Sequence, residues 1–179
     1  AAGFSGCGAR HAQRLNARPP LRAARIALGL TTLALCAALA LYLRPLQPGV
    51  LALQFAATPR AFAMVVHAWG DAGLARYRAH LPWDFLLLAS CAAFGWQLAR
   101  HGGLCGALPR RLRTLAAAAL PLAASFGAGQ NLLHLWLTAA PRFGPAWLYA
   151  LSAALAGAKW LCVLIFGGLL CAALLRRAH

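Results

Sequence analysis

The chain alternates between long apolar segments and shorter segments that contain arginine or proline. The first apolar segment, Ile26 to Leu43, has eighteen residues without a charge. A helix needs about 20 apolar residues to cross the hydrocarbon core of a bilayer, so segments of this length predict membrane-spanning helices. We therefore expect an all-α polytopic membrane protein, folded as a four-transmembrane-helix bundle. Its predicted spans cover about residues 26–43, 82–98, 115–137 and 147–175.

The connection between the first two predicted spans has a helical pattern of its own. Thr58 can cap a helix whose first residue is Pro59, since both residue types favour those positions. The pattern predicts an amphipathic helix over about residues 59–72 that lies on the outer membrane surface. Before it, the apolar run 50–55 is expected to be extended. The apolar face of the predicted surface helix consists of Phe62, Val65, Val66 and Trp69.

Composition agrees with a lipid environment. Hydrophobic residues make up 62% of the 179 residues and charged residues only 11%, whereas a soluble domain usually has about 25% charged residues. The chain has sixteen Arg and one Lys but only two acidic residues, which gives a net charge of +15. Because the Arg residues flank apolar segments, we expect them to contact anionic lipid headgroups on the cytoplasmic side. Nucleic-acid binding, which a basic soluble protein would suggest, is excluded on this pattern.

The distribution of positive charge predicts the orientation in the membrane. With four spans, residues 1–25, the loop around 99–114 and the C-terminus share one side. That side holds eleven Arg and the other side five. Cytoplasmic loops have the excess of Arg and Lys, so both termini are predicted to be cytoplasmic in an inner (plasma) membrane. Residues 1–25 are predicted to form a mobile basic tail, followed by the membrane domain 26–179.

The sequence offers little support for a metal, a cofactor or a known catalytic motif. Its six Cys include no CxxC pair, so neither a disulfide framework nor a zinc site is predicted. Of the six His, only His134 lies in a predicted span, which leaves a haem between two helices without its second ligand. No nucleophile-elbow, zinc-protease, Walker or dinucleotide-binding motif is present. We therefore predict no cofactor.

Lys159 is the only charged residue deep within a predicted span. A charge at that depth costs about 2.5 to 3.5 kcal/mol, so the side chain is expected to face the bundle and to find a partner. The alternative is that it snorkels to an interface. On the third span, Gln130, Asn131 and His134 share one face with the small residue Gly127. We predict that this face packs on the last span and that Lys159 contacts Gln130 or Asn131.

Asp84 is the acid that could neutralise Lys159. At the predicted outer start of the second span, it could instead complement the helix dipole. One hypothesis is that five residues line an outward-facing polar pocket, and the alternative is that they only hold helices together. The five candidate site residues are Asp84, Gln130, Asn131, His134 and Lys159.

Four short sequence features suggest a relationship to known proteins. They are Trp69-Gly70, Leu81 to Phe85, Pro121 to Leu133, and Ala158-Lys159-Trp160. On these features the chain resembles a group of uncharacterised bacterial inner-membrane proteins with four spans. That group tends to have a D-x-x-E-N pattern in its third span, whereas here only the final Asn131 is retained. The missing acids argue against a role that needs carboxylates there, such as metal binding.

Three functional classes follow from the sequence. The first is a binding or accessory protein whose outer-half polar pocket holds a lipid, a quinone or a partner helix. The second is a membrane-embedded enzyme that uses Asp84 or His134 as a general acid or base. The third is a small transporter that acts as an oligomer, because four spans without repeats offer little for alternating access.

Overall fold

The computed structural model describes residues 18–101, 104–139 and 145–178, and this part of the chain is helical without strands. Three of its helices are long and apolar enough to cross a membrane: Ala23–Leu43, Arg110–Leu137 and Ala146–Arg177. The helical segments are α2 (Arg18–Leu43), α3 (Val50–Gln54), α4 (Pro59–His101), the 3-10 helix η1 (Leu104–Ala107), α5 (Arg110–Leu137) and α6 (Ala146–Ala178).

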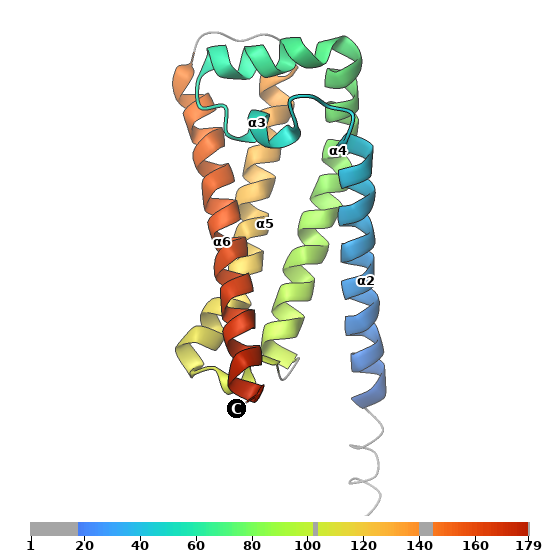
Figure 1. The fold of residues 1–179 in the computed structure, drawn as a ribbon, viewed down its shortest axis with the longest axis vertical. Coiled ribbons are helices and arrows are strands. Elements are labelled where there is room, and N and C mark those ends of the chain that lie inside the picture. The colour runs from blue at the N-terminus through green and yellow to red at the C-terminus, as the bar shows by residue number, and fades with distance from the viewer. Residues whose placement is uncertain (1–17, 102–103, 140–144, 179) are drawn as a thin grey trace, which may run out of the picture.

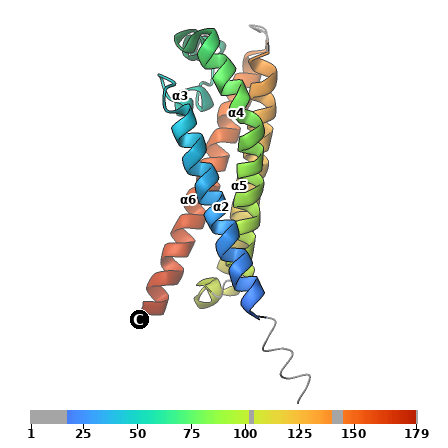
Figure 2. The same ribbon diagram turned by 90° about the vertical axis from the view of Figure 1, so that its right-hand side faces the viewer.

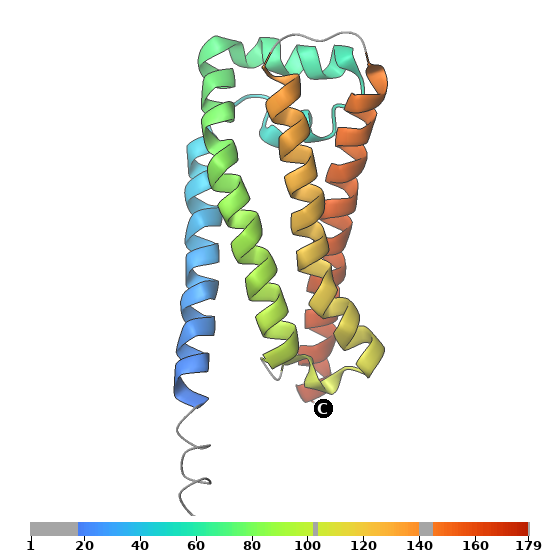
Figure 3. The same ribbon diagram turned by 180° about the vertical axis from the view of Figure 1, so that it is seen from behind.

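Four long rods run side by side in the molecule: α2, the second part of α4, α5 and α6 (Figure 1). α5 packs along both α4 and α6, whereas α2 packs on α4 (Figures 1 and 3). We call the end that contains the start of α2 and the C-terminus the basic end. The opposite end, where α3 and the first part of α4 lie, is the cap end.

A sharp corner divides α4 into two helices. The corner is at Gly70, whose φ of 61° and ψ of −174° are not helical. A residue with a Cβ rarely adopts this backbone conformation. Before the corner, α4 crosses the cap end above the other helices, and after it α4 runs along the bundle (Figures 1 and 2). Gly70 therefore sets the direction of the transverse segment, residues 59–69.

The transverse segment packs its apolar face onto the bundle. Its start is as predicted: the helix begins at Pro59, and the backbone N–H of Ala61 donates to Oγ1 of Thr58 at 3.1 Å. The indole of Trp69 also donates to the carbonyl of Pro48 at 2.7 Å, which fixes the preceding loop. The cap core of buried residues consists of Leu46, Leu53, Ala56, Phe62, Val65, Trp69, Tyr77, Leu81, Leu137 and Tyr149.

Three sequence-based boundaries were wrong. α2 begins at Arg18, so residues 18–25 belong to a helix and not to a tail, and the rest of the predicted tail lies outside the described residues. Residues 50–54 are helical and not extended, which buries Leu53. Pro82 lies inside α4 and does not begin a helix. Arg25 and Pro82, which suggested two of these boundaries, lie inside α2 and α4 and do not interrupt them.

Replacing Gly70 with Ala should destabilise the fold by about 1 to 3 kcal/mol, because the new side chain would be held at a positive φ. A Cβ at this position would have open space, so backbone strain is the only expected cause. Gly157→Ala is the matched control, since its Cβ also meets nothing within 4 Å and its φ is ordinary. Thermal unfolding in detergent should show a lower midpoint for Gly70→Ala than for the control. Equal midpoints would contradict the proposed strain.

Candidate functional site

Three polar residues of α5 lie where the helix passes between its neighbours. Gln130, Asn131 and His134 are all buried, with 0%, 4% and 1% of their surface exposed. Successive helical residues point about 100° apart, so Gln130 and Asn131 reach different neighbours. We call these three residues and their hydrogen-bonded partners the polar layer. Its partners are Gln54 of α3, Tyr77 and Asp84 of α4, and Ser152 and Lys159 of α6.

Lys159 is held by two amide side chains. Its Nζ donates to Oε1 of Gln130 at 2.9 Å and to Oε1 of Gln54 at 3.3 Å. Only 9% of the residue is exposed, so the predicted contact with Gln130 is confirmed and the snorkelling alternative is wrong. Gly127 allows the side chains of Lys159 and Leu88 to lie close to α5. A Cβ at this position would lie 3.2 Å from Cδ of Lys159 and 2.7 Å from a methyl group of Leu88.

Gln54 closes the polar layer from the cap side. Besides Lys159, its Oε1 accepts a hydrogen bond from the indole of Trp160 at 3.2 Å. Its backbone carbonyl accepts one from Nε2 of Gln130 at 3.4 Å. The short helix α3 thus brings a residue of the first interhelical connection into contact with α5 and α6. Gln54 was not among the five predicted site residues, although an amide within the apolar run 50–55 was a usable signal.

Asp84 binds Asn131 and does not act as a helix cap. Nδ2 of Asn131 donates to Oδ2 of Asp84 at 2.8 Å. Asp84 lies well inside α4, more than three turns beyond the corner at Gly70. The helix dipole acts only within the first or last turn, so the expected dipole role is wrong. The hydrogen bonds of Lys159 are to amide oxygens, whereas the carboxylate of Asp84 joins α4 to α5.

His134 joins three helices through its two ring nitrogens. The hydroxyl of Tyr77 lies 2.5 Å from Nδ1, and Oγ of Ser152 lies 2.8 Å from Nε2. A neutral imidazole has one donor and one acceptor nitrogen, so one of these hydroxyls donates to the ring and the other accepts from it. Burial raises the pKa of Tyr77 above its ordinary value, and the charge of Asp84 adds to this effect, so the phenol stays protonated.

The polar layer is internally satisfied. Among the described residues, every buried side-chain nitrogen and oxygen has a hydrogen-bond partner. Such a layer fixes the relative positions of α3, α4, α5 and α6, because an unpaired polar group in a low-dielectric interior is costly. The five residues predicted from the sequence are therefore brought together, but in three separate groups. Gln130 and Lys159 bind each other, Asn131 and Asp84 bind each other, and His134 binds Tyr77 and Ser152.

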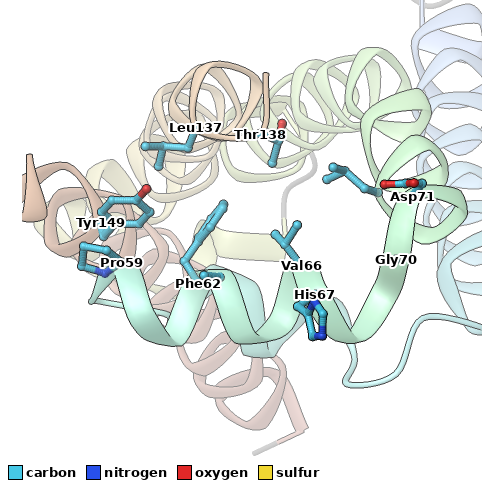
Figure 4. Close-up of a pocket in the computed structure, with 11 residues that line it drawn as sticks. Pro59, Phe62, Val66, His67, Gly70, Asp71, Leu137, Thr138 and Tyr149 are labelled. Carbon is cyan, nitrogen blue, oxygen red and sulfur yellow. The ribbon is translucent and has the colours of Figure 1, made fainter. Parts of the chain in front are cut away.

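A cavity of about 370 Å³ lies at the cap end between the transverse segment and the ends of α5 and α6. We call it the cap cavity. Figure 4 shows Phe62 and Val66 of the transverse segment facing Leu137 and Thr138 of α5, with Tyr149 of α6 at one side. Asp71 lies near the corner of α4 at the other side (Figure 4). The lining is thus mainly apolar, with few polar groups at its edges.

Two aromatic side chains separate the cap cavity from the polar layer. The ring of Phe62 meets His134 edge-on, with centroids 5.7 Å apart, and meets Tyr149 at 5.2 Å. Thr138 connects the two regions on the opposite side: its Oγ1 donates to the carbonyl of His134 at 2.6 Å and accepts from Arg78 at 3.1 Å. A molecule in the cap cavity would therefore rest on groups that contact the polar layer.

Comparison of the chain with protein-family models, with curated proteins and with solved structures finds no match. The resemblance to four-span bacterial inner-membrane proteins stays a prediction. The geometry of the cap end is therefore the basis on which a function can be proposed.

Replacing Gln130 with Leu should lower stability by about 1.5 to 3 kcal/mol, the usual contribution of a hydrogen bond to a charged group. Lys159→Met removes a buried charge but leaves Oε1 of Gln130 without its donor, so we expect its net effect on stability to be small. In the double variant, Gln130→Leu should cost less than it does alone, because the ammonium that would lose one of its two amide acceptors is absent. Unfolding free energies of the four proteins in detergent give this coupling directly. Identical costs in the two backgrounds would show that the pair does not interact.

Proposed function

We propose that the chain is a four-span inner-membrane protein that binds a small lipophilic molecule in the cap cavity. The cavity itself is the observation on which the proposal rests. Small-molecule sites are commonly concave, mostly apolar, about 300 to 1,000 Å³ in volume, and equipped with a few polar groups that orient the ligand. The cap cavity, at about 370 Å³, meets each of these criteria.

The size of the cap cavity favours a lipid or quinone over a partner helix. A helix with its side chains is about 10 Å across, and inserting one would require the transverse segment to leave the bundle. A ring or an acyl chain fits without this rearrangement. Its apolar part would contact Phe62, Val66 and Leu137, while Thr138 or Asp71 would accept hydrogen bonds from it at the edge. The hydrogen-bonded polar layer would then form the rigid base of the cap cavity.

The fourth crossing in this proposal is made by residues 82–98 of α4. Between Arg78 and Arg100 the only charged residue is Asp84, and it is hydrogen-bonded to Asn131. This part of α4 runs beside α2 and α5 (Figure 3). An apolar helix that packs against two candidate spanning helices is suited to cross the same hydrocarbon layer. The transverse segment would then lie at the membrane surface, above the ends of the spans.

Charge supports an orientation with the basic end in the cytoplasm. Cytoplasmic segments have the excess of positive residues. Among the described residues, nine Arg lie at the basic end and four at the cap end. The nine are Arg18, Arg22, Arg25, Arg100, Arg110, Arg111, Arg113, Arg176 and Arg177, and the four are Arg44, Arg60, Arg76 and Arg78.

Cysteine labelling in intact cells tests this orientation. In a variant whose six native Cys are replaced, a membrane-impermeant thiol reagent should label Ala75→Cys and not Gly106→Cys. Both positions are exposed and so are accessible once the reagent reaches their side of the membrane. After the cells are opened, both should be labelled, which controls for reactivity. Labelling of Gly106→Cys alone in intact cells would reverse the orientation.

Filling the cap cavity should abolish binding. Ala63 lines the cavity, so a Trp at this position would occupy it, whereas Met64 on the same helix is 64% exposed and lies outside it. The protein is purified from its membrane, and the lipophilic molecules that it retains are identified and counted by mass spectrometry. We expect one species in near-stoichiometric amount with wild type and Met64→Trp, and at least a tenfold loss with Ala63→Trp. Equal retention by both variants would place the ligand elsewhere.

A further inference from the structure

A second hollow lies between α2 and α4, far from the cap cavity. It measures about 780 Å³ and opens at the basic end. We call it the lateral groove. In Figures 1 and 3, the two helices separate as they approach this end of the molecule. The lateral groove is lined by Arg25, Ile26, Gly29, Leu30 and Leu33 of α2 and by Phe94 and Leu98 of α4.

The lateral groove is a long apolar surface with one positive charge. Among the described residues that line it, Arg25 is the only charged one, and it is half-buried. Leu30 and Leu33 continue the surface along α2 and are 62% and 66% exposed. At Gly29 the side chain of Phe94 reaches across from α4 to α2, since a Cβ there would lie 2.9 Å from the ring of Phe94. A chain-like apolar molecule with an anionic head matches this arrangement.

The charges around the lateral groove favour an anionic head over a zwitterionic one. Both acids of the chain, Asp71 and Asp84, lie in the half of α4 nearer the cap end. At the basic end, the described residues include nine Arg and no acid. A phosphate can form paired hydrogen bonds with a guanidinium. The ammonium of a zwitterionic head, in contrast, would find several like charges and no Asp or Glu among the described residues of this end.

We infer that the lateral groove binds an anionic phospholipid. Its phosphate lies at Arg25, and one acyl chain runs along Ile26, Leu30 and Leu33 between α2 and α4. A second copy of this chain is a poorer occupant, because it would bring two strongly basic ends together. This site is independent of the cap cavity and of any ligand bound there.

Lipid titration followed by native mass spectrometry in detergent tests the site. The purified wild-type protein is titrated with phosphatidylglycerol or with phosphatidylcholine of the same acyl chains. We expect phosphatidylglycerol to be retained more strongly by about fivefold, the contribution typical of one Arg near a membrane surface. Glycerol phosphate, which has the head without the chains, should not compete. Equal retention of the two lipids, competition by glycerol phosphate, or a lipid-free dimer would each overturn the proposal.

Two pairs of variants locate the bound lipid. Arg25→Gln should remove the preference for phosphatidylglycerol, whereas Arg44→Gln, at the other end of the same helix, should keep it. Leu30→Trp should reduce retention by obstructing the groove, whereas Leu41→Trp, which is 68% exposed and outside the groove, should not. Unfolding midpoints close to wild type establish that each variant is folded. An unchanged preference in folded Arg25→Gln would remove Arg25 from the site.

Discussion

The ammonium group of Lys159 is the constraint to which the centre of the molecule is adapted. A charge in this position must be surrounded by hydrogen-bond acceptors, because burial removes it from solvent. Two amide oxygens from separate elements, Gln130 on α5 and Gln54 on α3, meet that need. Gly127 leaves room on α5 for Lys159 of α6 and Leu88 of α4, and the position of Gln54 requires that α3 be a helix turned into the bundle. One buried cation thus determines the contacts of three segments.

The two ends of the bundle are stabilised in different ways. The cap end has a core of large side chains, in which Leu53, Tyr77 and Leu81 are at most 1% exposed. The basic end instead packs small residues such as Ala116, Ala117 and Ala173 against Leu108. Small residues allow helix backbones to approach closely where lipid surrounds the bundle. The cap end, with its large buried rings, resembles the interior of a soluble protein.

Much of the fold follows from the sequence because its determinants are local. Runs of apolar residues predict the long helices, and Thr58-Pro59 predicts where the transverse segment begins. The contact between Lys159 and Gln130 was also predictable, since helix phase and depth place both groups on facing sides. Gln54 and Tyr77 were missed because their positions depend on the corner at Gly70 and on the path of the preceding loop. Neither is determined by the residues immediately around them.

One proline and one acidic residue led to a wrong prediction of where a helix begins, for a related reason. Pro82 and Asp84 are common at the beginnings of helices, so together they suggested that a span starts there. In the fold, the helix starts earlier, and Asp84 is tied to Asn131 on the next helix. A tertiary partner explains the carboxylate where a local rule does not. Tyr77, seven residues before Asp84, shares a helical face with it, and this periodicity appears only when α4 is continued through Pro82.

The position of α2 has a consequence for biogenesis. Along the chain α2 precedes its packing neighbour α4, and the whole cap-end connection lies between them. Between Ile26 and Leu43 it has no charged residue, and most of its side chains are exposed even in the finished bundle. Such a helix is stable in hydrocarbon on its own, so it can leave the translocation machinery without waiting for a companion. The helices with buried polar groups, α4, α5 and α6, come later in the chain. Each of them has its hydrogen-bonding partners on segments that precede it or on the helix that follows it.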